Sequence, residues 1–163
     1  MRRNQSGVTL IELVVLIVVL ALLAVAIFPR LGNLLQVMQS KGASEEVAGA
    51  LILARQYAIT RGIHHCIEFS GSPPTTGYRI KSTTAANACN GGIVQDTTTI
   101  SQGVAVVNLV FTPASGDNFV VFSPVGDVTN ATSVTAGVDT SPPSCLSSVL
   151  VTLYGGVRVS RSC

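Results

Sequence analysis

The chain has 163 residues, which is enough for one domain with its own hydrophobic core and gives little reason to expect two. Hydrophobic residues make up 47% of the sequence, and their excess is concentrated in the first 30 residues. The formal net charge is +2, but Arg2 and Arg3 precede the apolar run, and without them eight basic residues balance eight acidic ones. A neutral chain excludes a bulk electrostatic attraction to nucleic acid or to anionic surfaces.

The first element is an apolar run of 21 residues, Val8–Phe28, with a single charged residue. As a helix with a rise of about 1.5 Å per residue it would be about 31 Å long, close to the roughly 30 Å of a bilayer core. No small-residue cleavage site follows the run, so it differs from a secretory signal peptide. Arg2 and Arg3 should stay in the cytoplasm. The sequence therefore predicts a single-pass membrane helix with the remaining chain on the outer side.

The one charge in this run is Glu12. A carboxylate inside an apolar helix costs about 2.5 to 3.5 kcal/mol near the bilayer centre and usually marks a functional residue. The alternative interpretation is that Glu12 lies near the helix start, where the helix dipole favours a negative charge.

The segment GVTLIE, from Gly7 to Glu12, follows a short basic leader and resembles the start of type IV pilins and type II secretion pseudopilins. The resemblance implies that a prepilin peptidase removes residues 1–7 by cutting after Gly7 and that the new amino terminus, Val8, is methylated. It also implies that Glu12 neutralises an amine of a neighbouring subunit during filament assembly. Pairing two buried charges between subunits offsets the cost of each and fixes the axial register. Val8 departs from the family, in which Phe is usual.

Pro29 follows the apolar run and stands where pilins commonly carry a helix-kinking proline. A proline inside a helix removes one backbone hydrogen bond, so we expect residues 8–29 to form a membrane and assembly helix that is kinked at its end. Residues 30–62 then predict an amphipathic helix that packs on the rest of the chain and ends at Gly62. Its expected stripe, with spacings of three and four residues, is Leu31, Leu34, Leu35, Met38, Val47, Ala50, Leu51, Ala54, Tyr57 and Ala58.

Residues 63–163 are rich in β-branched residues, Gly, Pro, Ser and Thr and predict a small β-rich head. We expect an α+β fold in which the long N-terminal helix packs on an antiparallel sandwich or rolled sheet. Val125–Ser141 reads as an exposed loop. The expected strands are Ile63–Phe69, Gly77–Lys81, Val104–Thr112, Asn118–Ser123, Val149–Tyr154 and Val157–Ser160.

Three segments of the head resemble the H-type minor pseudopilins, the GspH/FimT group. They are ALILARQYAI at residues 50–59, VFSPVGD at residues 121–127 and VTLYGGVRV at residues 151–159. The resemblance implies the pilin fold and a minor subunit of a type II secretion pseudopilus or a type IV pilus. A major pilin of similar length is the nearest alternative.

The four cysteines, an even number behind an export-type N-terminus, favour disulfides over a zinc site. Gly155-Gly156 predicts a two-residue hairpin, in which Cys163 lies opposite Ser148 and Cys145 is within a short loop of it. This favours pairing Cys145 with Cys163 and, by elimination, Cys66 with Cys89, although the sequence alone does not select one of the three connectivities.

No sequence pattern indicates an enzyme, a metal site or a cofactor. His64 and His65 are adjacent, and neighbours on a strand point to opposite faces, so they do not form a ligand pair. Arg158 and Arg161 raise a different possibility, because some FimT-like minor pilins that take up DNA carry a C-terminal Gly-Arg-x-Arg motif. Here Gly156 replaces one arginine, and two phosphate contacts would give weak, salt-sensitive binding.

The function expected from these features is a structural filament subunit whose partners are other pilins, the prepilin peptidase and the inner-membrane assembly platform. Its expected location is the bacterial inner membrane, with the head in the periplasm, and then the pilus or pseudopilus. One alternative is a DNA-binding minor pilin for natural transformation. Another is a signal-anchored periplasmic domain that is not cleaved after Gly7.

Overall fold

The computed structural model describes residues 9–70, 74–100, 104–112, 117–140 and 146–162. Within these ranges, side chains are not described for residues 26–34, 36, 104–112, 139–140, 146 and 161–162. Chain contacts divide the protein into two units, Met1–Leu35 and Gln36–Cys163.

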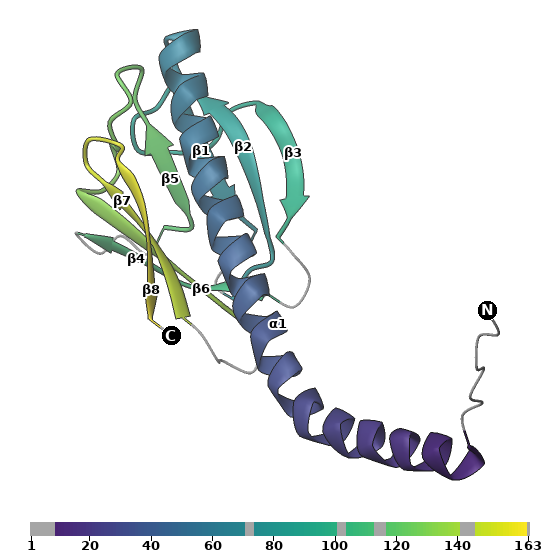
Figure 1. Cartoon of the computed structure of the whole chain (residues 1–163). Coiled ribbons are helices and arrows are strands. Elements are labelled where there is room, and N and C mark those ends of the chain that lie inside the picture. Colours follow the sequence, from purple (N-terminus) through teal and green to yellow (C-terminus); the bar gives the residue numbers. More distant parts are fainter. Residues whose placement is uncertain (1–8, 71–73, 101–103, 113–116, 141–145, 163) are drawn as a thin grey trace, which may run out of the picture. The chain divides into compact units, whose positions relative to one another are not determined.

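The single helix of the described chain, α1, begins at Leu10 and ends at Arg61 (Figure 1). It continues through Pro29, so that residue does not terminate it, and the expected kink there stays a prediction. Its end is the one expected: Gly62 has a φ of 65°, and its N–H donates to the carbonyl oxygen of Ala58 over 3.1 Å. This left-handed glycine is a common way to end a helix.

No helix among the described residues is both long enough and apolar enough to cross a membrane. The expected span, Val8–Phe28, extends at both ends beyond the residues whose side chains are described.

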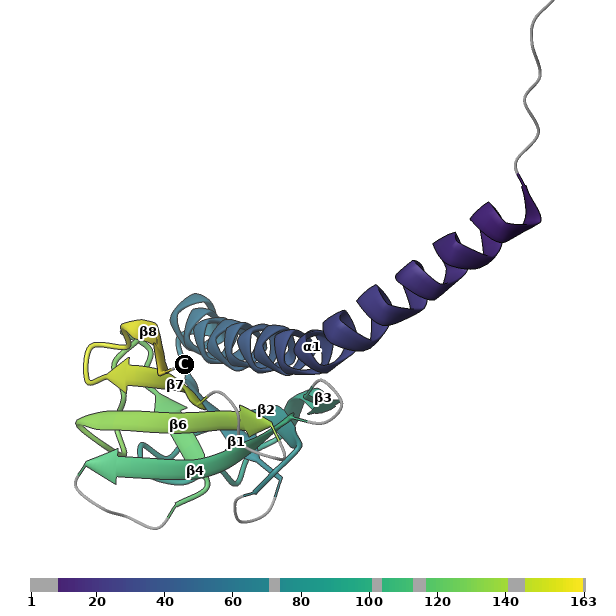
Figure 2. The same cartoon turned by 60° about the horizontal axis from the view of Figure 1, so that its bottom comes forward.

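In its described residues, the head contains two four-stranded antiparallel sheets (Figure 2). The first has the strand order β3-β2-β1-β5 and the second the order β4-β6-β7-β8. The strands are β1 His64–Phe69, β2 Gly77–Thr83, β3 Ile93–Thr99, β4 Val104–Thr112, β5 Phe119–Phe122, β6 Ser133–Thr140, β7 Leu146–Thr152 and β8 Val157–Ser162. The expected α+β fold with an antiparallel β head is confirmed.

One hydrophobic core joins the second half of α1 to both sheets. The helix contributes small side chains and Val47 and Leu51, while the largest fully buried strand residues are Phe69 and Phe122. The predicted stripe is confirmed from Val47 to Ala58 but wrong at Leu35 and Met38, which are both 59% exposed. The side chains of Leu31 and Leu34, at its expected start, are not described. Alanines on the buried face allow the sheets to approach the helix closely.

Two strands differ from the sequence expectations. The segment Val125–Ser141 is not simply a loop, because β6 lies within it and pairs with both β4 and β7. Val134, Ala136 and Val138 are buried at every second position, and Gly137 between the last two is buried as well, so small and polar residues obscured this strand in the sequence. Strand β3 was not predicted, and it is an edge strand whose threonine-rich side chains are largely exposed.

Candidate functional site

The start of α1 carries the residues expected to act in processing and assembly. Thr9 caps the helix: its Oγ1 accepts the N–H of Glu12 over 3.3 Å, and its carbonyl oxygen accepts the N–H of Leu13 over 3.2 Å. Thr and Glu three residues apart form the sequence pattern of a capping box, which could have identified Thr9 from sequence. Glu12 therefore lies in the first helical turn, where the helix dipole favours its charge. Gly7 and Val8 lie outside the described residues.

The apolar side chains that follow have no partner surface among the described residues of their own unit. From Leu10 to Val25 the large apolar side chains are between 47% and 82% exposed, all around the helix. A helix that is hydrophobic all round is normally buried in protein or lipid. This segment therefore needs an apolar environment that a single chain in water does not provide.

Arg55 joins three distant segments of the head. Its Nε donates to the carbonyl oxygen of Gly126 over 2.9 Å, and one terminal nitrogen donates to that of Tyr154 over 3.1 Å. These residues belong to the three segments at 50–59, 121–127 and 151–159, which the sequence singled out separately. The sequence alone assigns Arg55 no role, because only the fold brings its two acceptors together.

The two glycines at this junction have backbone conformations that other residues rarely adopt. Gly126 has a φ of 89° and Gly155 a φ of 71°. A Cβ atom on Gly126 would lie 2.8 Å from Nε of Arg55, and one on Gly155 would lie 2.1 Å from the carbonyl oxygen of Gly126. Both positions therefore require glycine for conformational and for steric reasons.

The β7–β8 hairpin differs from the predicted two-residue turn. Val151 pairs with Val157, and Gly155 N–H donates to the carbonyl oxygen of Thr152 over 2.8 Å. The turn is closed by a bond of 2.9 Å from Thr152 N–H to Gly156 O, which leaves a three-residue loop ending in the left-handed Gly155. Such loops are a common alternative to two-residue turns. The predicted register is therefore wrong by three residues: Ser148 lies opposite Ser160.

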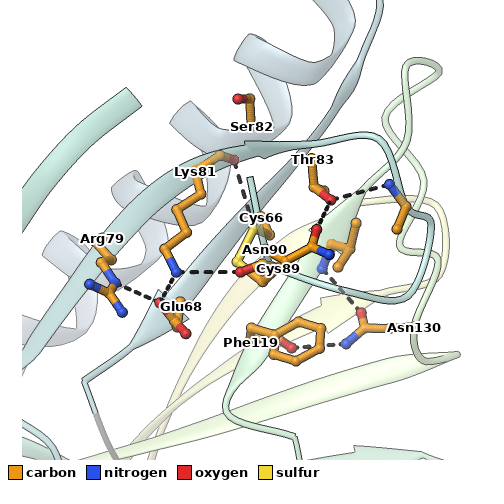
Figure 3. The surroundings of a disulfide bond; sticks show 12 residues. Cys66, Glu68, Arg79, Lys81, Ser82, Thr83, Cys89, Asn90, Phe119 and Asn130 are labelled. Atoms are coloured by element: carbon orange, nitrogen blue, oxygen red, sulfur yellow. Dashed lines mark hydrogen bonds and ion pairs between the residues drawn. A yellow bond between two sulfur atoms is a disulfide. The ribbon is translucent and has the colours of Figure 1, made fainter. Parts of the chain in front are cut away.

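A disulfide joins Cys66 of β1 to Cys89, as expected, with a Cα–Cα distance of 5.7 Å (Figure 3). Beside it, Glu68 forms two ion pairs. Its Oε2 lies 2.5 Å from Nε of Arg79 and 2.7 Å from Nζ of Lys81. Nζ of Lys81 also donates to the carbonyl oxygen of Cys89 over 3.3 Å, so the ion pair and the disulfide hold the same loop. Cys145 and Cys163 lie outside the described residues.

Glu68 keeps its charge despite partial burial. Burial alone would raise its pKa, but the hydrogen bonds and positive charges of Lys81 and Arg79 outweigh this, and the pKa lies below its ordinary value. The cluster thus consists of three mutually satisfied side chains, as in a structural ion pair, and presents no group prepared for proton transfer.

His65 is fully buried and His64 is half-buried. Nδ1 of His65 lies 3.1 Å from the carbonyl oxygen of Ile63, while its Nε2 is buried without a hydrogen-bond partner among the described residues. Burial, with a smaller effect from the charge of Arg61, lowers the pKa of His65. In the described part of the chain, no group of three or more His, Cys, Asp or Glu residues is arranged to hold a metal ion.

The two arginines proposed for DNA contact occupy β8. Arg158 is exposed and lies opposite Leu150, whereas Arg161 lies opposite Ser147, which is fully buried. Because residues directly opposite each other share one face of a sheet, the register assigns Arg158 and Arg161 to opposite faces. The side chain of Arg161 is not described.

Comparisons with known proteins agree with this arrangement of helix, head and N-terminal segment. Residues 43–153 match the family model described as Type II transport protein GspH, and residues 2–28 match the prokaryotic N-terminal methylation motif. No curated protein matches the chain.

Two solved structures have a similar fold. The type IV minor pilin FimU of Pseudomonas aeruginosa matches with 14% identity and a TM-score of 0.54, covering 74% of this chain and 91% of that one. The minor pseudopilin EpsH of the Vibrio cholerae type 2 secretion system matches with 18% identity and a TM-score of 0.54, covering 75% and 96%. At these identities the likeness establishes the fold.

The chain thus combines an N-terminal methylation motif with a head that has the fold of the minor pilin FimU and the minor pseudopilin EpsH. The GspH match covers more than half of the sequence, so the chain belongs to the GspH family of type II transport proteins. The expected family, fold and minor-subunit function are therefore confirmed.

Proposed function

We propose that this minor pilin or pseudopilin is cut after Gly7, methylated at Val8 and built into a helical filament through the first part of α1. The observation that carries the proposal is the helix Leu10–Val25, whose large apolar side chains are all at least 47% exposed. In a filament, neighbouring subunits would bury this surface, and burying a large apolar side chain contributes about 1.5 to 3 kcal/mol.

Processing would place a positive charge beside the helix cap. Cutting after Gly7 leaves Val8 as the one residue before Thr9, whose side chain caps the helix. The new ammonium and the Glu12 carboxylate are then both close in sequence to the helix start. Glu12 neutralises the amine of a neighbouring subunit, which fixes the axial register between two helices.

Before assembly, the segment Val8–Phe28 anchors the chain in the bacterial inner membrane with the head in the periplasm. The support is the sequence: 21 apolar residues with one charge, preceded by Arg2 and Arg3. The disulfide between Cys66 and Cys89 fits an oxidising compartment. The partners in this account are the prepilin peptidase, the inner-membrane assembly platform and other pilin-type subunits.

The DNA-uptake alternative stays a separate prediction. It requires Arg158 and Arg161 to contact phosphates together, and the β7–β8 register gives these two residues no common face. A loss of DNA affinity in both Arg158→Ala and Arg161→Ala, steeply dependent on salt, would support it.

The assembly proposal is tested by Glu12→Ala in cells that assemble the filament, with incorporation measured in sheared filaments. Incorporation should fall sharply while the amount of membrane-inserted chain stays constant. Asp96→Ala is the control, because it also removes an exposed carboxylate but lies on the edge strand β3. Normal incorporation of Glu12→Ala would contradict the proposed role of the carboxylate.

A further inference from the structure

His65 is fully buried near the start of β1 and has no part in the proposed assembly. Its ring centroid lies 5.9 Å from that of the Tyr57 ring on α1. The guanidinium carbon of Arg61, one turn further along α1, lies 4.8 Å from the centroid of the same Tyr57 ring. We call these three side chains the helix-end stack. The stack joins the last turn of α1 to the first strand of the head.

The site of His65 suits a neutral imidazole. Its Nδ1 lies 3.1 Å from the carbonyl oxygen of Ile63, and because a carbonyl oxygen only accepts, Nδ1 carries the hydrogen. Nε2 is then an acceptor, and it has no hydrogen-bond partner among the described residues. A second proton would turn Nε2 into a buried, charged donor without an acceptor. Burying an unpaired charge costs far more than burying an unpaired neutral acceptor.

In the described chain, the residues that face His65 provide no negative charge to compensate a second proton. From α1 these residues are Tyr57 and Arg61, and Arg61 is itself positive. In the sheet, His65 is paired with Ser82 of β2 and with Phe122 of β5, and both are uncharged. Burial is the largest cause that lowers the pKa of His65, and the charge of Arg61 lowers it further, while the backbone hydrogen bond opposes both.

On β1 itself, the nearest titratable side chains lie on the other face of the sheet. His64 and Glu68 are one and three positions from His65, and side chains at odd separations along a strand point to opposite faces. The carboxylate of Glu68 is also already paired, with Arg79 and with Lys81. A protonated His65 would therefore keep its charge uncompensated for as long as the helix-end stack stays closed.

The last turn of α1 is the part of this site that can open at the lowest cost. The residues from 59 to 63 are all exposed, so little apolar surface holds the turn in place. Gly62, with a φ of 65°, ends the helix there. Helix ends open locally at a smaller free energy than strands that are paired on both sides, as β1 is. We propose that protonation of His65 opens the last turn of α1, from Tyr57 to Arg61, and that the helix-end stack is an acid-sensitive latch of the head.

The open state would present a different surface at the end of α1. Water would reach the imidazolium of His65, and the helix end would gain a second positive charge beside Arg61. An exposed imidazole has the ordinary pKa of 6.5, so opening is favoured about tenfold for each pH unit below 6.5, down to the pKa of the closed state. The latch goes beyond the proposed function and does not depend on assembly.

Hydrogen exchange of the full-length protein in detergent tests the latch. Exchange is measured by mass spectrometry at about pH 7.5 and at about pH 5, with rates corrected for the intrinsic effect of pH on amide exchange. Peptides that cover residues 57–65 should lose protection by about tenfold or more at the lower pH, whereas peptides from β6 and β7 should change little. No loss at residues 57–65, or an equal loss in all strands, would overturn the inference.

Substitution of His65 shows whether its proton is the cause of the opening. His65→Phe keeps an aromatic ring against Tyr57 and needs no hydrogen bond, so it suits the buried site. His65→Gln removes the titrating group but keeps a polar one. In both variants the loss of protection at residues 57–65 between the two pH values should disappear. A loss as large as that of the wild type, in either variant, would overturn the role of His65.

Discussion

The guanidinium of Arg55 donates to the carbonyl oxygen of Gly126 over 2.9 Å across 71 residues of sequence. A second bond, 3.1 Å long, joins it to the carbonyl oxygen of Tyr154. One helix side chain thereby fixes the loop after β5 and the turn between β7 and β8. The three segments by which the head resembles its family meet at this point, so their shared feature is structural.

We predict that Arg55→Met destabilises the head by about 2 kcal/mol, because two carbonyl oxygens lose charged hydrogen-bond donors. Gly126→Ala should destabilise it by about 1 to 3 kcal/mol, since the φ of 89° strains any side chain. Chemical denaturation of the full chain in detergent measures both. Arg158→Ala, at an exposed arginine without these bonds, should change stability by less than about 0.5 kcal/mol. Equal effects of the two arginine substitutions would contradict the role of Arg55.

His65 should make the head less stable in acid. Burial lowers its pKa in the folded state below the ordinary value of 6.5, so the unfolded chain binds a proton more readily. This contribution is complete above pH 6.5 and is lost as the pH falls below that value. His65→Gln should flatten the decline in stability below about pH 6.5. An unchanged decline in His65→Gln would show that another group is responsible.

Glu68 should cause a second loss of stability of the head, at lower pH. Its folded pKa lies below the ordinary value of 4.5, so its stabilising contribution is present above pH 4.5 and is lost below it. Glu68→Gln should therefore flatten the stability curve only below about pH 4.5. The difference between the two windows allows His65 and Glu68 to be separated in a single pH series of denaturation curves.

Removal of the disulfide between Cys66 and Cys89 should lower stability by about 3 kcal/mol, the value expected from chain entropy for a closed loop of this length. The double variant Cys66→Ala and Cys89→Ala avoids leaving a single thiol. Cys145 and Cys163 are replaced in both proteins that are compared, so that they differ only at Cys66 and Cys89. The midpoint of denaturation of the variant without Cys66 and Cys89 should match that of the reduced protein that keeps them. A midpoint equal to that of the oxidised protein would show that the disulfide is not stabilising.

The pairing of Cys145 with Cys163 stays a prediction from the sequence, because both residues lie outside the described part of the chain. The last described pair of the β7–β8 hairpin is Leu146 with Ser162. Non-reducing peptide mapping should recover Cys145 linked to Cys163. A peptide linking Cys163 to Cys66 or Cys89 would contradict both pairings.

How far the sequence predicted this molecule differs from one element to another. The length of α1 and its end at Gly62 followed from periodicity and from a residue type with one conformational advantage. Strand β6 was missed because serine, threonine and glycine dominate a segment whose burial comes from its neighbours on both sides. The hairpin register was missed because two adjacent glycines fit more than one turn, and only the pairing of Val151 with Val157 decides between them.

The candidate sites show the same division. Thr9 and Glu12 interact three residues apart, so a local pattern contained the capping bond. Arg55 acts over 71 and 99 residues, and nothing in its immediate sequence distinguishes it from a surface arginine.

The central claim, a prepilin processed at Gly7 for filament assembly, is tested most directly by the mass of its N-terminus. The chain is produced in a host with a prepilin peptidase, and intact mass and N-terminal peptide mass are measured. The account predicts a chain that begins at Val8 and carries one methyl group on its amine. A chain that still begins at Met1 in the presence of active peptidase would contradict it and favour an uncleaved signal-anchored domain.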